Sequence, residues 1–207
     1  DFRTRVKVEN PELLRQLRED GHGRILVLTL HQGNWEWMLH ATNAALGEPM
    51  DPVYKPLHNH SANTLMHTVR SRFGARPLAL KSAARDILRM HDENRLLTMV
   101  ADQSPTRREK GLWTEFLHRP AAFHTGAESL ARRAGFPVVF ARCKRLRRGY
   151  YALQFSPITT TPREEADGAI TLRYAALAEQ AIREEPESWL WSNRRWKRSP
   201  ETEQVEG

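Results

Sequence analysis

The sequence predicts an α/β fold in a single domain, with a mixed central β-sheet flanked by helices. Short apolar runs, which are typical of buried strands, alternate along the chain with longer segments of helical periodicity. The chain has 207 residues, of which 40% are hydrophobic and 28% charged, so it is long enough to form one sizeable core. No internal repeat or low-complexity linker divides it, and we therefore expect residues 1–207 to form one domain.

In the first half of the chain, the ends of the helices are marked by glycines that follow the apolar periodicity, as at Gly47 and Gly74. Ser82 is expected to cap the helix that begins there, and the apolar strand 96–101 leads directly into Asp102. The helices expected in this half are 11–20, 35–46, 61–73 and 82–90, and the strands are 24–30, 52–54, 75–80 and 96–101.

In the second half, a long segment with little periodicity, 103–124, interrupts the alternation. A loop of this length inside a compact domain indicates a lid or a binding segment, with disorder as the alternative. After it, helical periodicity returns, then a pair of apolar strands around a basic turn, then an amphipathic helix. These elements are expected at 125–134, at 137–144 and 150–156, and at 169–184.

Candidate catalytic residues follow the first predicted strand, 24–30. His31 comes directly after it, and Glu36 lies beyond a turn that contains Gly33 and Asn34. Strands of open α/β sheets present functional residues at their carboxyl ends. A neutral imidazole can accept a proton from a hydroxyl, and a carboxylate can fix its tautomer. We therefore predict His31 as a general base oriented by Glu36, the alternative being an ordinary strand-end histidine and a first-turn helix acid.

The whole string LHQGNWEW at 30–37 resembles the His-x4-Asp/Glu box of the lipid A biosynthesis (late) acyltransferase family. The resemblance continues through further blocks in the family's order, and Asn193 stands where that family commonly has histidine. These blocks are VADQSP at 100–105, FLHRPAAF at 116–123, LAR at 130–132, FPVV at 136–139 and WLWSNRRWK at 189–197.

The resemblance implies a glycerolipid-acyltransferase-like fold and transfer of a fatty acyl group from acyl carrier protein, or from coenzyme A, to a hydroxyl of a lipid A precursor or related membrane glycolipid. It implies that His31 deprotonates the hydroxyl and that no acyl-enzyme is required. The sequence has no Gly-x-Ser-x-Gly elbow, and its one cysteine, Cys143, has no evident base beside it. No cofactor or metal is expected, because the acyl thioester is itself a co-substrate.

Substrate-binding residues are also implied by the resemblance. Arg70, in the phrase RSRFG, is expected to bind a phosphate or the thioester oxyanion, with Arg72 as the other candidate. Asp102 and Gln103 match the family's Asp-Gln position, and Asp102 would orient the substrate or a catalytic arginine. Asn34 of the His box completes the set. The alternatives are a solvated helical arginine and a loop cap.

The net charge of +7 and the pI of about 10.0 predict anionic partners. Basic clusters at 142–148 and 194–198 would attract an acidic acyl carrier protein, a phosphorylated glycolipid or an anionic membrane surface, or they are simply solvated. Trp189, Trp191 and Trp196 suit a membrane interface, with a core position as the alternative for Trp189 and Trp191. Nucleic acid is not expected as a partner, because no recognised motif or aromatic platform is evident.

No segment approaches the roughly 18 consecutive apolar residues of a membrane span. We expect a protein that acts peripherally at the cytoplasmic face of the bacterial inner membrane, without the amino-terminal membrane helix with which the family usually begins. A single cysteine excludes an internal disulfide and fits a reducing compartment. The histidines His58, His60 and His67 do not predict a metal site, because supporting carboxylates are lacking.

Two alternatives stay open at this point. One is an acyltransferase that acts on a lysophospholipid or another lipid. The other is a non-catalytic basic protein that binds nucleic acid or an anionic surface. The substitution His31→Ala distinguishes these hypotheses. An enzyme would lose turnover and keep its fold and membrane binding, whereas a binding protein would be little affected.

Overall fold

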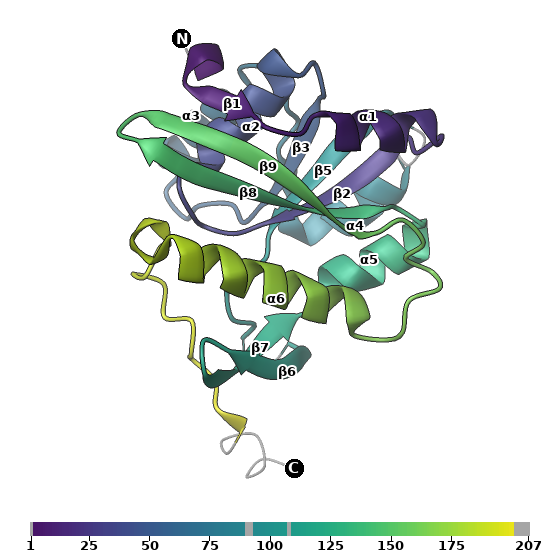
Figure 1. Cartoon of the computed structure of the whole chain (residues 1–207), viewed down its shortest axis with the longest axis vertical. Coiled ribbons are helices and arrows are strands. Elements are labelled where there is room, and N and C mark those ends of the chain that lie inside the picture. The colour runs from purple at the N-terminus through teal and green to yellow at the C-terminus, as the bar shows by residue number, and fades with distance from the viewer. Residues whose placement is uncertain (1, 90–92, 107–108, 201–207) are drawn as a thin grey trace.

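The computed structural model describes residues 2–89, 93–106 and 109–200 and has the predicted α/β architecture (Figure 1). Its helices are α1 (Glu12–Glu19), α2 (Trp35–Ala45), α3 (His60–Ser71), α4 (Leu80–Arg89), α5 (Gly126–Ala134) and α6 (Ala169–Glu184). Its strands are β1 (Val6–Val8), β2 (Arg24–Thr29), β3 (Met50–Tyr54), β4 (Leu78–Ala79), β5 (Arg95–Val100), β6 (Gly111–Phe116), β7 (Arg119–His124), β8 (Val138–Arg147) and β9 (Tyr150–Thr159).

Seven of the strands form one mixed sheet in the order β1-β9-β8-β2-β5-β3-β4. The central strand β2 runs parallel to β5 and β8, whereas β9 is antiparallel to β8. All six residues of β2 are buried. A strand that is covered on both faces needs apolar residues throughout, which explains the uninterrupted run that predicted this strand.

The two faces of the sheet contact different helices. Leu26 and Leu28 of β2 belong to a core cluster that includes buried residues of α4, α5 and α6. Ile25 and Val27 belong to a second cluster with buried residues of α1 and α2. Successive side chains of a strand point to opposite faces, so a single strand supplies both cores. In Figure 1, α5 and α6 lie below the sheet and α1 lies above it.

The strand register brings several strand ends to the same edge of the sheet. Val27 of β2 is paired with Thr98 of β5, and Thr98 is paired with Pro52 of β3. The residues that follow these parallel strands therefore emerge side by side. We call this side the carboxyl edge, and His31 and Asp102 both lie on it.

The segment 103–124, which we expected to be a loop with little regular structure, contains the β6–β7 hairpin. The hairpin turn is formed by Leu117 and His118, whose φ angles are 52° and 62°. Turns with two left-handed residues favour glycine or asparagine, and neither is present here. The prediction was wrong because the usual turn signal is missing. In Figure 1 the hairpin lies below α6, apart from the main sheet.

Three smaller expectations also differ from the structure. The strand β1 at the edge of the sheet is too short to show a pattern, and it was not predicted. The expected strand 75–80 is reduced to β4. The helix α4 begins at Leu80, so Ser82 lies inside it and donates to the carbonyl of Ala79 instead of capping the helix; Met90, its expected end, lies outside the described residues.

The long helix α6 begins on a buried carboxylate. Glu128 of α5 accepts hydrogen bonds from the backbone N–H groups of Gly168 and Thr171, at 2.6 and 2.9 Å. This contact satisfies amides that a helix start leaves without partners, and it ties α6 to α5. Among the described residues, no helix is long and apolar enough to cross a membrane.

Candidate active site

His31 follows β2, and its imidazole is held by Asp102, which follows β5. The Nδ1 atom of His31 lies 2.6 Å from Oδ1 of Asp102, and the backbone N–H of His31 donates to Oδ2 at 3.1 Å. The ring of Trp35 meets the imidazole edge to face, with centroids 5.1 Å apart. Contacts on two sides therefore fix the orientation of the ring.

Asp102 is almost completely buried, with 1% of its surface exposed. Burial raises its pKa, but hydrogen bonds from His31 and from the indole N–H of Trp189, together with the charge of His31, outweigh burial, and the pKa of Asp102 lies below its ordinary value. Asp102 is therefore ionised at neutral pH. A carboxylate in this position accepts a hydrogen bond from Nδ1 and leaves Nε2 of His31 as the proton acceptor.

The predicted orientation of His31 by Glu36 is not what the structure shows, because Asp102 occupies Nδ1. Glu36, in the first turn of α2, instead accepts hydrogen bonds from Nε of Arg70 at 3.1 Å and from its Nη2. The Arg70 guanidinium also lies over the ring of Tyr54, 5.8 Å from its centroid. Two residues of the His box thus take part in separate carboxylate contacts, His31 with Asp102 and Glu36 with Arg70.

The turn between His31 and α2 is tightly packed against β8. Gly33 has a φ of 61°, and a Cβ at this position would overlap the carbonyl oxygen of Cys143. The side chain of Asn34 accepts from the backbone N–H of Trp37 and caps α2. The thiol of Cys143 donates to the carbonyl of Asn34 at 3.4 Å. Only glycine fits where the turn crosses the strand, so the sequence of the turn is dictated by packing.

The closing segment, residues 186–198, folds back onto the His box. The backbone N–H of Leu190 donates to the carbonyl of His31 at 2.9 Å, and that of Gly33 donates to the carbonyl of Ser188 at 3.0 Å. Gln32, fully buried, donates to the carbonyl of Ala181 at the end of α6. His31 and its loop are therefore held in place by a segment that lies far away in sequence.

Arg195 of the closing segment is buried close to Asp102. Its guanidinium lies 4.2 Å from the ring centroid of Phe123 and 5.4 Å from that of Phe116. Burial lowers the pKa of Arg195 to about 10, while the charge of Asp102 opposes that shift. All three guanidinium nitrogens lack a hydrogen-bond partner among the described residues. The arginine thus acts on Asp102 through its charge, from within an aromatic cluster.

The remaining predicted site residues are spread around this centre. Asn34 uses its side-chain oxygen as a helix cap, and Gln103 is exposed beside Asp102. Arg72 is exposed on the side of α3, with its guanidinium 5.8 Å from the ring centroid of Phe73. Of the predicted set, the structure brings together His31 with Asp102, and separately Glu36 with Arg70.

Three residues of the site were not predicted from the sequence. Trp189 donates to Asp102, Arg195 lies behind it, and the buried Tyr174 hydroxyl donates to the carbonyl of Thr29 at 2.8 Å. The sequence left Trp189 open between a membrane interface and the core, and it predicted the arginines of the closing segment as anion-binding or solvated residues. Their inward position depends on how the last segment folds back, which no local pattern reveals.

The single cysteine is an unsuitable nucleophile, because burial raises the pKa of the Cys143 thiol to about 11. Among the described residues, no group of three or more histidine, cysteine or acidic side chains is arranged to hold a metal ion. The arrangement offers a general base, an ionised partner that stabilises its protonated form, and an arginine fixed nearby. These groups suit proton abstraction from a hydroxyl and attack on an acyl carbon.

Comparison with protein families gives a match over nearly the whole chain. A family model described as bacterial lipid A biosynthesis acyltransferase matches residues 1–198. A search of curated proteins found no match. The matched region contains the His box, Asp102 and the closing segment.

Proposed function

The chain belongs to the bacterial lipid A biosynthesis acyltransferase family, and we propose that it transfers a fatty acyl group from an acyl carrier protein thioester to a hydroxyl of a lipid A precursor or related glycolipid, with His31 as the general base. The observation that supports this proposal is the 2.6 Å contact between His31 Nδ1 and Asp102. It leaves Nε2, for which no partner is found among the described residues, available to a substrate hydroxyl.

The reaction follows from this arrangement. Nε2 of His31 takes the proton of the acceptor hydroxyl, and the oxygen attacks the thioester carbonyl carbon. The tetrahedral intermediate then expels the thiolate, which receives the proton from the imidazolium, so that an ester and a free thiol leave. Asp102 stabilises the imidazolium between these two steps. No acyl-enzyme is required, which agrees with the raised pKa of Cys143.

In this proposal Arg70 binds the anionic part of the substrate. Glu36 engages Nε and Nη2 of Arg70, and no partner of Nη1 is found among the described residues. A guanidinium held in this way can bind a phosphate of the glycolipid or the oxyanion of the intermediate. Glu36 then acts as a positioning residue for Arg70, and the site of action is the cytoplasmic face of the inner membrane.

The test is acyl transfer by the intact protein with acyl carrier protein or coenzyme A thioesters as donors, and a lipid A precursor or lysophospholipids as acceptors. We expect Asp102→Asn and His31→Ala each to lower kcat about 10²–10⁴-fold. Glu36→Gln should mainly raise KM, because it releases Arg70 and leaves the base in place.

The double variant His31→Ala/Asp102→Asn serves as a control and should be no less active than His31→Ala alone, since the two residues act as one unit. Equal loss of kcat in Glu36→Gln and Asp102→Asn would contradict the proposed roles. Turnover with lysophospholipids only would change the acceptor and keep the mechanism. Absence of turnover by folded protein with every donor and acceptor would overturn the proposed function.

A further inference from the structure

Exposed apolar side chains are concentrated around the carboxyl edge of the sheet. Of the large apolar side chains that are exposed in the described part of the chain, only Leu172, on α6, belongs to a different surface. The others come from three separate segments that follow or pass the carboxyl edge. Soluble surfaces normally scatter such residues, so their concentration around one opening requires an explanation.

The first segment lies on the β3 and β4 side of His31. Tyr54 at the end of β3 is paired with Ala79 at the end of β4, so Lys55 and Leu80 leave the sheet side by side. Leu80 is 57% exposed, and Leu57, in the loop after β3, is 49% exposed. Apolar and cationic side chains therefore alternate at this part of the edge.

The helix α3, which follows that loop, has no buried residue along its 12-residue length. Leu65 and Val69, four residues apart, lie on the same side of the helix and are 63% and 40% exposed. Arg72 follows one turn later on that side. The same helix carries Arg70, which binds Glu36 near the base. This exposed apolar stripe is thus directly connected to the candidate active site.

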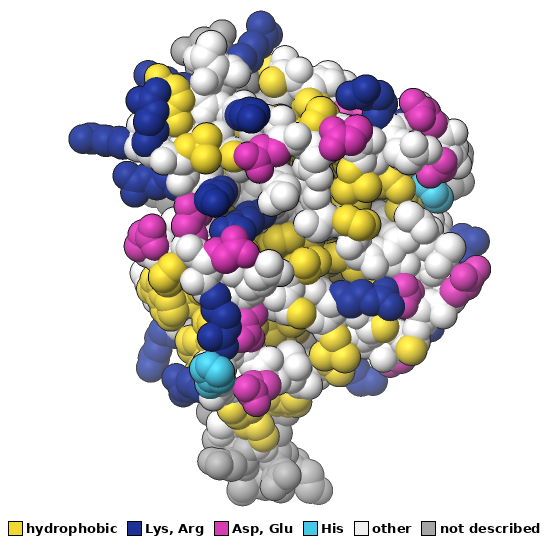
Figure 2. All heavy atoms as spheres, viewed as in Figure 1, with side chains coloured by type: hydrophobic (Ala, Val, Ile, Leu, Met, Phe, Trp, Pro, Cys, Tyr) yellow, Lys and Arg dark blue, Asp and Glu magenta, His cyan; other side chains and the backbone are white. Residues whose placement is uncertain are grey.

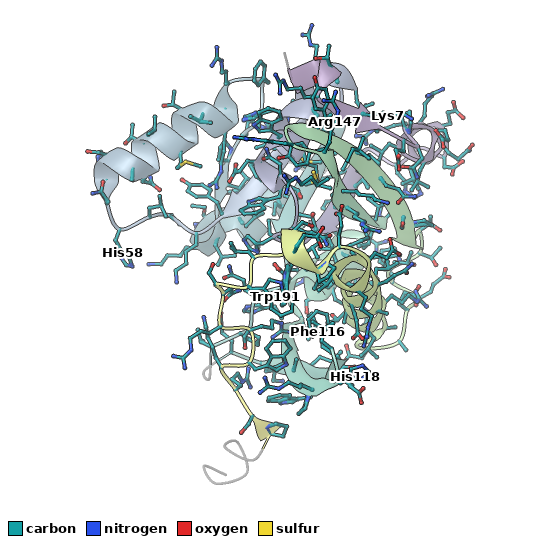
Figure 3. All side chains as sticks on the ribbon, turned by 60° about the vertical axis from the view of Figure 1, so that its left-hand side comes forward. Lys7, His58, Phe116, His118, Arg147 and Trp191 are labelled. Carbon is teal, nitrogen blue, oxygen red and sulfur yellow. The ribbon has the colours of Figure 1, made fainter. Side chains whose placement is uncertain are left out.

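The second and third segments lie on the opposite side of His31. The strand β8 passes the His box at Cys143 and continues as the exposed sequence 144–148, in which Leu146 is 53% exposed. Trp191, 53% exposed, lies one residue after Leu190, whose backbone N–H binds the carbonyl of His31. Figure 3 labels one residue of each segment: His58 lies at the left, Arg147 lies above, and Trp191 lies near the centre.

Both flanks are cationic. The sequence has no acidic residue from 52 to 85 or from 129 to 163. Among the described residues, no ion pair is found for Lys55, Arg72, Lys81 or Lys144, all of which are exposed. Figure 2 shows Lys and Arg side chains gathered at the upper left, over the end of the β8–β9 hairpin, with hydrophobic side chains among them. The carboxyl edge therefore presents positive charge and single apolar side chains together.

We infer that this edge, with Leu57, Leu65, Val69 and Leu80 on one flank and Leu146 and Trp191 on the other, docks on a bilayer that contains anionic lipids. Isolated leucine and tryptophan side chains surrounded by lysine and arginine suit insertion between headgroups. A protein partner would instead need a continuous apolar centre. His31 then faces the headgroup layer, where a lipid acceptor is found. Only this last step depends on the proposed function.

The test is binding of the intact protein to vesicles of phosphatidylcholine, with and without phosphatidylglycerol. We expect binding to the anionic vesicles, a loss of about tenfold or more in Leu65→Gln/Val69→Gln, and a loss of roughly 25-fold in Lys81→Gln/Lys144→Gln at low salt. Brominated lipids should quench tryptophan fluorescence in the wild type, and this quenching should be reduced in Trp191→Phe.

Leu172→Gln is the matched control, because Leu172 is exposed to a similar extent but lies elsewhere, and it should bind as the wild type does. Loss of binding in this control to the same extent, or unchanged binding in both double variants, would overturn the inference. The inference would also be overturned if the double variants still bound vesicles but no longer bound an acidic carrier protein. The carboxyl edge would then be a binding surface for the acyl donor.

Acyl transfer to a detergent-solubilised acceptor separates this inference from the proposed function. The Leu65→Gln/Val69→Gln variant should turn over this acceptor at the wild-type rate while it binds vesicles poorly. Vesicle binding that depends on the edge, without turnover by any variant or by the wild type, would support the docking inference and contradict the proposed function.

Discussion

The titratable side chains at His31 lie at successive depths below the protein surface. The imidazole lies at the surface of the site, Asp102 is buried beneath it, and Arg195 lies behind Asp102 among aromatic rings. A buried carboxylate needs favourable interactions to remain ionised. Here His31 and Trp189 supply hydrogen bonds, and the charge of Arg195 interacts with Asp102 without a hydrogen bond. The ionised state of Asp102, which orients the imidazole, is thus favoured by a buried cation that makes no hydrogen bond to it.

Arg195→Met tests this dependence. The buried guanidinium has no hydrogen-bond partner among the described residues, so an apolar side chain of similar length should leave the free energy of unfolding within about 1 kcal/mol of the wild type or raise it. Asp102 loses a favourable charge, its pKa rises, and the acid limb of the pH–rate profile should move to higher pH. Arg194→Met, at the exposed neighbouring position, should leave the profile unchanged. An unshifted acid limb in Arg195→Met would contradict the positioning role.

At the scale of elements, the sequence predicts the elements that have strong local signals. The apolar run of β2 and the glycines that follow α2 and α3 predict the bounds of these elements to within a few residues of those observed. The β6–β7 hairpin is missed, because its turn uses Leu117 and His118 in a conformation that favours glycine. The contact between His31 and Asp102 depends on the register of β2 and β5. Sequence spacing alone predicted Glu36 as the carboxylate that orients His31.

The turn that carries His31 is packed so closely against β8 that substitution at Gly33 should be costly. Gly33→Ala should lower the free energy of unfolding by about 2–4 kcal/mol and abolish activity, because the added methyl group overlaps the Cys143 carbonyl and φ is positive. Gly47→Ala is the control, since its φ is also positive at 69° but nothing lies within 4 Å of the added atom. It should cost about 1–2 kcal/mol, from the left-handed backbone alone. Chemical denaturation of both variants measures the difference, and equal costs would show that packing against β8 is unimportant.

For the whole molecule, acid sensitivity is expected from two histidines in separate parts of the fold. Burial lowers the pKa of His40 in α2 and of His124 in β7 from the ordinary value of 6.5. As pH falls through about 6.5, the unfolded chain takes up protons that the folded state does not, so stability is lost between that value and the lower folded pKa.

The melting temperature should therefore fall as the solution is acidified below about pH 6.5, by an amount that reflects about 1.4 kcal/mol for each unit by which a folded and an unfolded pKa differ. The double variant His40→Gln/His124→Gln should show a shallower dependence, and His60→Gln, on the exposed start of α3, should behave as the wild type does. A double variant with the wild-type slope would show that other groups control acid stability.

The closing segment has a consequence for the timing of activity during synthesis. Trp189, Leu190 and Arg195 complete a site whose histidine, His31, is translated more than 150 residues earlier. While the ribosome is still translating the region before residue 189, the emerging polypeptide has His31 and Asp102 but lacks the Trp189 indole, the Leu190 backbone amide and the Arg195 guanidinium of the complete site. We therefore expect the nascent chain to remain catalytically silent until residues 189–195 have left the exit tunnel, however early His31 and Asp102 have folded.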